Sequence, residues 1–162
     1  MVEGVTDIGT AEFAELMAGD RRLLDRLAQG ERICAVTPFR YPGLRGQVVA
    51  YLTPCPPVPD EPRRVVVSDG GGLIKSLDEQ GLDLAVDMIV SKTVFHAVRD
   101  VKGANIGSGE LYIDSDLAHL PADMWRFLQL MAELVGLRHS KYKDALLHMS
   151  SRGEQQPDLI NW

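Results

Sequence analysis

A glycine-rich segment is the part of this sequence that comes closest to a ligand-binding motif. It reads Ser68-Asp69-Gly70-Gly71-Gly72, with Lys75-Ser76 shortly after it. A phosphate-binding loop needs the spacing GxxxxGK[ST] ahead of a helix, whereas here the spacing differs and an apolar run follows. Asp-Gly and Gly-Gly between apolar runs are typical of hairpin turns, because glycine supplies the positive φ that tight turns require. We therefore predict a hairpin turn, and keep Asp69, Gly70 and Gly71 as candidate ligand contacts.

Carboxylates suggest a second kind of chemistry. Glu110, Asp114 and Asp116 lie close together in the sequence, and Asp69 could join them. A Mg²⁺-dependent nuclease pairs such acids with a lysine on a neighbouring strand, but no Asp…Glu-x-Lys pattern occurs here. We expect solvated acids at a strand end, with a metal-dependent site as the alternative.

Histidines and cysteines form no recognisable catalytic or metal-binding set. The four histidines have no HxH or HxxxH spacing, and His96 is expected to be a partly buried structural residue. Cys34 and Cys55 are isolated, so they do not make a zinc site. We expect reduced thiols, although a disulfide would be feasible if their strands are neighbours. No catalytic residue, metal or cofactor is predicted.

Basic residues gather at two places and suggest a contact with an acidic partner. Arg63 and Arg64 form one, and Arg138, Lys141 and Lys143 form the other. They could build a nucleic-acid face, although basic residues near a helix end are also common as solvated groups. Trp125 lies among methionines on an expected helix, which favours either the core or a partner surface.

The elements that position these residues belong to one domain, because the chain has 162 residues and 45% of them are apolar. The formal net charge is −6, which lowers the expectation of non-specific nucleic-acid binding. No signal peptide, transmembrane segment or lipidation motif is recognised, so we expect a cytoplasmic protein without membrane contact.

The apolar spacing predicts about three helices and four to six strands. Helices are expected over residues 10–28 with Thr10 as N-cap, over 82–99, and from Pro121 to about 135 with a continuation over 137–149. Strands are expected over 32–37, 47–53, 63–68, 73–77 and 110–114, with turn-rich connectors at 38–43 and 54–59. Residues 1–9 and 150–162 are expected to be flexible ends of a single domain spanning 1–162. The order is not an alternating βαβ pattern, so we predict an α+β fold whose antiparallel sheet carries helices mainly on one face.

The order of these motifs resembles one family. Thr37-Pro38-Phe39 ends a strand, Val66-Val67-Ser68-Asp69-Gly70-Gly71 follows the next, and Leu77 precedes Gly81-Leu82-Asp83. This order is similar to the bacterial and prophage-type domain of unknown function family 1828 over about residues 31–117. The chain departs from that pattern at Gly70, where a second acidic residue is usual, and in its inserted loop at residues 54–62. The family has no assigned activity, so the resemblance implies a bacterial or mobile-element accessory protein and no catalytic residue.

Three functions therefore stand as hypotheses. The first is a non-enzymatic accessory protein, of phage or prophage origin, that acts by contact with another protein. The second is a metal-dependent nuclease or hydrolase that uses Asp69, Asp114 and Asp116. The third is either a nucleic-acid-binding module or a dimer like the type III secretion chaperones, which the element order resembles more weakly and which bind unfolded partner segments.

Overall fold

The computed structural model describes residues 5–41, 47–83, 86 and 88–135, and within them the chain forms six strands and five helices. The strands are β1 (Val5–Ile8), β2 (Arg32–Arg40), β3 (Gln47–Pro54), β4 (Arg64–Ser68), β5 (Ala104–Gly107) and β6 (Glu110–Asp116). The helices are α1 (Thr10–Met17), α2 (Arg21–Ala28), α3 (Gly72–Glu79), α4 (Met88–Arg99) and α5 (Leu120–Val135).

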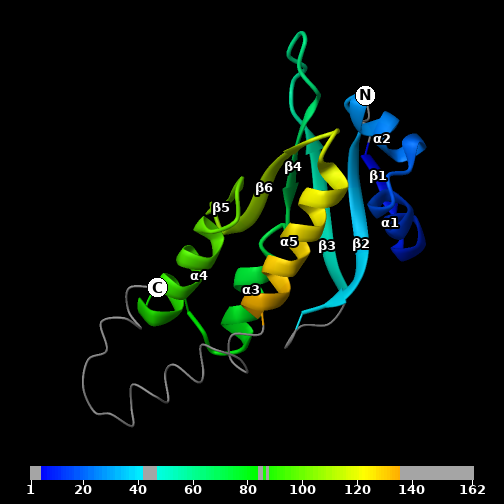
Figure 1. Cartoon of the computed structure of the whole chain (residues 1–162). Coiled ribbons are helices and arrows are strands. Elements are labelled where there is room, and N and C mark those ends of the chain that lie inside the picture. Colours follow the sequence, from blue (N-terminus) through cyan, green and yellow to red (C-terminus); the bar gives the residue numbers. More distant parts are fainter. Residues whose placement is uncertain (1–4, 42–46, 84–85, 87, 136–162) are drawn as a thin grey trace, which may run out of the picture.

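The strands form one mixed sheet in the order β1-β2-β3-β4-β6-β5 (Figure 1). β1 pairs with β2 in parallel, and the other four pairings are antiparallel. The predicted α+β class and the mostly antiparallel sheet are confirmed. The described chain has two more helices than the expected three, because the first helix is divided and the glycine-rich segment leads into a further one.

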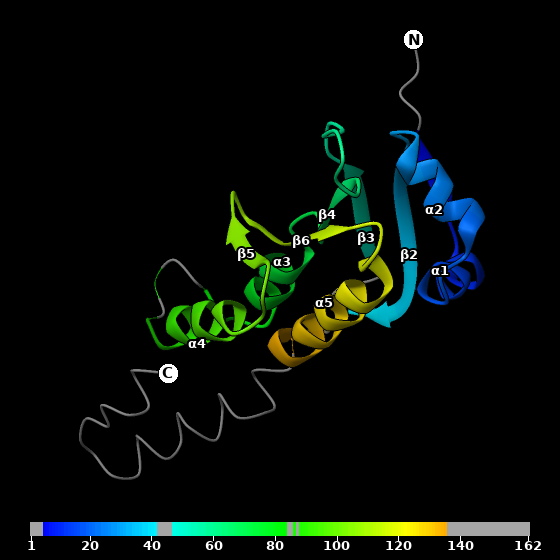
Figure 2. The same cartoon turned by 45° about the horizontal axis from the view of Figure 1, so that its top comes forward.

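The helices pack against one face of this sheet. Along β2, β3, β4 and β6, buried residues alternate with exposed or half-buried ones, as expected for a sheet with one covered face. Helix α5 crosses the middle of the helical layer, between α1 and α2 on one side and α3 and α4 on the other (Figure 2). Its buried side chains complete the core, and they are Leu120, Met124, Phe127, Leu128, Leu130, Met131 and Leu134.

The opposite side of the sheet, which we call the open face, is partly exposed to solvent. The strand register aligns four of its residues in one row, namely Cys34, Tyr51, Ser68 and Tyr112. Two further rows are made by Val36 with Val49, and by Thr53 with Val66 and Asp114. The centre of the open face therefore carries β-branched and aromatic side chains.

The helix expected over residues 10–28 is two helices, and Thr10 does not cap the first. Gly9 occupies the N-cap position of α1 without a side-chain hydrogen bond. Helix α1 ends where Gly19 adopts a φ of +85°, and the N–H of Asp20 donates to the carbonyl of Glu15 at 3.0 Å. The carboxylate of Asp20 then accepts from the N–H of Arg22 at 2.8 Å, which starts α2.

The strand expected over residues 73–77 is wrong, because these residues form part of α3. Leu73 and Leu77 are four residues apart and both fully buried, which is the spacing of one helix face. The glycine-rich segment is therefore a strand-to-helix turn, and the prediction of a hairpin there is also wrong.

The other predicted helix and strand boundaries differ less from those of the structure. The expectation of a flexible lead-in does not hold for Val5–Ile8, which form β1. The described part of the second helix begins at Met88 rather than at residue 82. Pro121 lies in the first turn of α5 as predicted. The expected continuation over 137–149 and the expected flexible end at 150–162 lie outside the described residues.

The two cysteines are separate thiols. Cys34 lies on β2 opposite Tyr51, Cys55 follows the end of β3, and both are free. Burial, followed by the charge and hydrogen bond of Asp7, raises the pKa of the Cys34 thiol.

Candidate functional site

Asp69 holds together the glycine-rich turn between β4 and α3. Its side chain is 4% exposed. One carboxylate oxygen accepts from the N–H of Gly71 at 2.8 Å and from that of Leu111 at 3.0 Å, while the other accepts from the N–H of Leu73 at 2.9 Å. The pKa of Asp69 is raised mainly by burial, against the opposing effect of these three hydrogen bonds. The carboxylate thus joins the start of α3 to β6, and each of its oxygens already has a partner.

The residues around Asp69 fill the remaining space at the turn. A Cβ atom built on Gly70 would lie 2.5 Å from the ring of Tyr51, and one on Gly72 would lie 2.3 Å from the hydroxyl of Tyr41. Gly70 and Gly71 have φ values of +65° and +92°, which an L-residue rarely adopts. The glycines therefore admit two tyrosine rings against the backbone, and this close packing accounts for their use without a ligand.

Tyr41 is the exception among the buried groups near this turn. Its hydroxyl is buried and has no hydrogen-bond partner among the described residues. Burial, then the charge of Asp69, raises the pKa of Tyr41. Both effects favour the neutral phenol.

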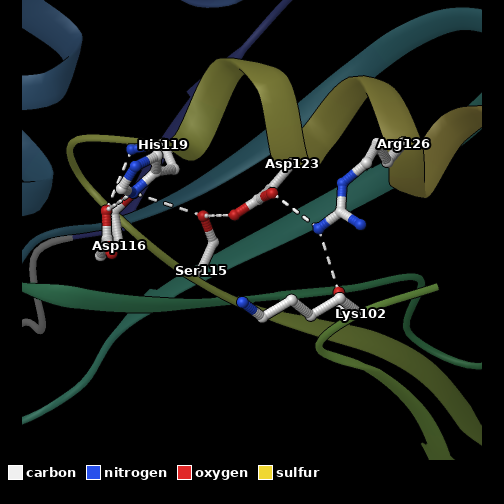
Figure 3. A network of polar contacts seen from close by, with 6 residues as sticks. All are labelled: Lys102, Ser115, Asp116, His119, Asp123 and Arg126. Carbon is white, nitrogen blue, oxygen red and sulfur yellow. Dashed lines mark hydrogen bonds and ion pairs between the residues drawn. The ribbon is translucent and has the colours of Figure 1, made fainter.

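A second group of polar side chains forms a network where β6 leads into α5 (Figure 3). The Ser115 hydroxyl is 2.7 Å from an Asp123 carboxylate oxygen, and the Arg126 guanidinium is 2.8 Å from the other. The same guanidinium donates to the carbonyl of Lys102 at 3.0 Å. The network thus ties α5 to the end of β6 and to the segment that precedes β5.

His119 belongs to the same region but not to a catalytic triad. Its Nδ1 lies 2.9 Å from a carboxylate oxygen of Asp116, whereas Ser115 is bonded to Asp123 (Figure 3). A serine nucleophile needs the histidine as its own hydrogen-bonded base. The arrangement therefore positions the start of α5 and does not activate the hydroxyl.

Several of the charges around this network form ion pairs. The network borders a cleft of about 440 Å³ whose lining also includes Arg64, Asp114 and Glu61. Arg64 pairs with Asp114 at 3.6 Å, in addition to the Arg126–Asp123 and His119–Asp116 contacts. Because most charges here already face an opposite charge, little field remains for a charged ligand.

The three carboxylates of the metal hypothesis do not converge. Asp69 is bonded to Leu111, and Asp114 and Asp116 lie three and five residues further along β6, or about 10 and 17 Å at the rise of a strand. Asp69 points into the covered side of the sheet, whereas Asp114 is on the open face. Among the described residues, no group of three acidic, histidine or cysteine side chains could hold a metal ion.

The basic residues that the sequence suggested as a contact surface do not form one site among the described residues. Arg63 donates through Nη1 to the carbonyl of Ala28 at 3.1 Å and through Nε to that of Cys55, so it anchors the loop before β4. Arg64 is engaged with Asp114. The expected second basic site, with Arg138, Lys141 and Lys143, lies outside the described residues.

A basic cleft that the sequence did not reveal lies between α4 and β5. It has a volume of about 730 Å³, and its cationic lining residues are Lys92, Arg99 and Lys102. Lys92, His96 and Arg99 follow one another at helical spacing, which was the available signal. The cleft was missed because its far wall comes from residues after the helix, whose proximity depends on the turn into β5.

Exposed apolar side chains lie on both sides of the molecule. Trp125 on α5 is 52% exposed and is therefore not a core residue, and Phe95 on α4 is 50% exposed. On the open face Tyr51 is 43% exposed. Within the described residues, no helix has the length and hydropathy needed to span a membrane.

No protein-family profile, curated protein or solved structure matches the chain.

Proposed function

We propose that this chain is a non-enzymatic protein-binding accessory module, and that the open face of its sheet is the contact surface. The observation that carries the proposal is the residue content of that face. The outward side of an antiparallel sheet usually carries polar side chains when water covers it, but here Tyr51 is 43% exposed and lies near Val36, Val49 and Val66, together with the polar Ser68 and Thr53. Exposed aromatic and apolar side chains on a sheet face are a feature of protein interfaces.

The state of the polar groups supports binding over catalysis. Asp69 accepts hydrogen bonds from three backbone N–H groups, and Ser115 is bonded to Asp123 rather than to a base. These contacts stabilise turns and helix ends. A side chain set for acid–base or nucleophilic chemistry would instead keep one polar atom directed at a substrate.

The sequence resemblance supplies the setting for this proposal. We infer a cytoplasmic protein of bacterial, phage or prophage origin, related to the domain of unknown function family 1828. Its partner is another protein, and a homodimer formed through the same face is the competing arrangement.

Site-specific photo-crosslinking tests the contact surface directly. A photo-reactive phenylalanine analogue at Thr53, which is exposed on the open face, should form an adduct with a partner protein inside the native host. The matched control carries the analogue at Gln129, which is exposed on α5 and faces away from the sheet. Circular dichroism confirms that both variants fold.

A second substitution makes the test specific for the face. Val66→Lys places a charge beside Thr53 on the adjacent strand, so the Thr53 adduct should disappear while the thermal midpoint stays close to that of the parent. Equal adducts from Thr53 and Gln129, or an adduct that survives Val66→Lys, would show that the open face is not the surface used. An adduct with the mass of two copies of the chain would replace the accessory partner with a homodimer.

A further inference from the structure

The basic cleft between α4 and β5 is an open hollow with the volume of a small-ligand site. Its volume of about 730 Å³ lies in the usual range for ligand pockets. One wall is the outer side of α4, and the other is the segment from Val101 to Asn105. Arg126 fixes this second wall by donating to the carbonyl of Lys102.

The charges in this cleft are of one sign. Lys92, Arg99 and Lys102 line it, and none of its ten lining residues in the described structure is acidic. Among the described residues, none of these three cations takes part in an ion pair. The neighbouring cleft at Arg64 and Asp114 shares Lys102 with this one and is lined by charges of both signs. The basic cleft thus occurs in a chain whose formal net charge is −6.

The uncharged polar groups of the cleft also present donors. The Arg99 guanidinium has only donors, so Nδ1 of His96 must accept from it at 2.9 Å, and the imidazole proton then resides on Nε2. The Oδ1 atom of Asn105 accepts from the N–H of Ile106 at 2.8 Å, which leaves the amide N–H groups of Asn105 to donate. A ligand that fits this set carries negative charge and mainly acceptors, as a phosphate group does.

An exposed aromatic ring stands beside these donors. Phe95 lies one turn of α4 from both Lys92 and Arg99, lines the same cleft and is 50% exposed. Phenylalanine rings next to cations bind the planar bases of nucleotides by stacking. Neither an inorganic anion nor an acidic peptide would use this ring in the same way.

We propose that the cleft binds a nucleotide, with Arg99, Lys92 and Lys102 on its phosphate and Phe95 against its base. Free nucleotides and single-stranded nucleic acid share this chemistry. The cleft borders the open face at Asn105, which pairs with Tyr112, but it includes neither Thr53 nor Val66. The two proposals are therefore tested at different residues.

Calorimetric titration of the full chain with four probes tests the site. The probes are adenosine monophosphate, adenosine, inorganic phosphate and a single-stranded thymidine octamer. Adenosine monophosphate should bind more tightly than adenosine and more tightly than phosphate, because only it engages both the cations and the ring. Binding of the octamer more tightly than the mononucleotide identifies a nucleic-acid strand as the source, and the reverse order identifies a free nucleotide.

Three variants assign the residues. Arg99→Gln should weaken nucleotide binding about tenfold or more, since a charge-assisted hydrogen bond is lost. Phe95→Leu should weaken nucleotide binding and leave phosphate binding unchanged. Lys75→Gln removes an exposed lysine from α3, away from the cleft, and should have no effect.

Each result of these measurements either supports the nucleotide site or overturns it. Thermal melting shows whether each variant is folded, and Lys102→Gln replaces Arg99→Gln if the latter unfolds. The proposal is overturned if no probe binds at millimolar concentration, if adenosine binds as well as its monophosphate, or if Lys75→Gln weakens binding as much as Arg99→Gln does.

Discussion

Replacing Asp69 tests the idea that one buried carboxylate holds the turn between β4 and α3. In Asp69→Ala the N–H groups of Gly71, Leu73 and Leu111 all lose their acceptor. An unsatisfied buried donor costs about 1–3 kcal/mol. The removal of a buried charge returns part of that cost, so we expect the free energy of unfolding at pH 7 to fall by about 3–5 kcal/mol.

A milder variant shows which oxygen matters. In Asp69→Asn the amide oxygen can still accept from Gly71 and Leu111, but the amide N–H₂ group then faces the N–H of Leu73. One lost hydrogen bond and one donor facing another should reduce the free energy of unfolding by about 1–3 kcal/mol. The order of stability should therefore be parent, then Asp69→Asn, then Asp69→Ala.

Urea denaturation followed by circular dichroism measures this order. With a slope of about 2 kcal/mol/M, the midpoint should fall by about 0.5–1.5 M for Asp69→Asn and by about 1.5–2.5 M for Asp69→Ala, with the slope itself unchanged. Asp78→Asn is the matched control, because Asp78 is exposed on α3. If Asp69→Ala shifts the midpoint no more than Asp78→Asn does, the three hydrogen bonds do not stabilise the turn.

Three other expectations follow from the same structure. Burial raises the pKa of Asp69 above its value in the unfolded chain, so its contribution to stability is greatest below the unfolded pKa and declines as the pH rises through the native pKa. The difference in unfolding free energy between the parent and Asp69→Asn should therefore be larger at pH 4 than at pH 7. A difference that grows with pH would contradict a raised pKa. Gly103 has a φ of +84°, and a Cβ there would lie 2.9 Å from the carbonyl oxygen of Asp114. Gly103→Ala should thus lower the free energy of unfolding by about 2–3 kcal/mol. In the control Gly9→Ala the added Cβ has no atom within 4 Å, so the loss should be less than about 1 kcal/mol. Similar losses in both variants would contradict the steric argument. The raised pKa of Cys34 predicts slow alkylation at pH 8, and Asp7→Asn should accelerate it because the nearby negative charge is removed. Mass spectrometry of the labelled peptides measures the rate, with Cys34→Ala as control. An equal rate in the parent and Asp7→Asn would contradict the influence of Asp7.

The fold class could be predicted from the sequence because its longest signals are local. The alternation in β3, the apolar spacing of α5 and the proline at its start each identify an element without reference to the rest of the chain. The strand β1 could not be found this way. Four residues carry too little periodicity, and Val5–Ile8 become a strand only because β2 offers a parallel partner.

At the turn that contains Asp69, the positive φ angles were predicted correctly but the element after the turn was not. Positive φ values at Gly70 and Gly71 were anticipated, and they occur. A hairpin and a strand-to-helix turn share this requirement, so glycines do not distinguish them. The spacing of Leu73 and Leu77 was the deciding signal, together with an acid placed to accept from the first turn of a helix.

The candidate sites were less accessible than the fold. The sequence identified Asp69, but its role depends on the N–H of Leu111, which is 42 residues away. The basic cleft joins α4 to residues beyond a turn, and the open face exists only once the strand register is known. Sites made by non-local pairing leave no pattern of spacing in one sequence.

The central position of α5 affects how the chain acquires its structure during synthesis. Strands β1 to β4 and the first three helices leave the ribosome before α5 does, yet α5 contributes a large share of the core. Until it arrives, the buried side of β6, against which α5 packs, lacks this cover. A nascent chain that stops before residue 120 is therefore expected to stay bound to holdase chaperones, and release is expected only after α5 has emerged.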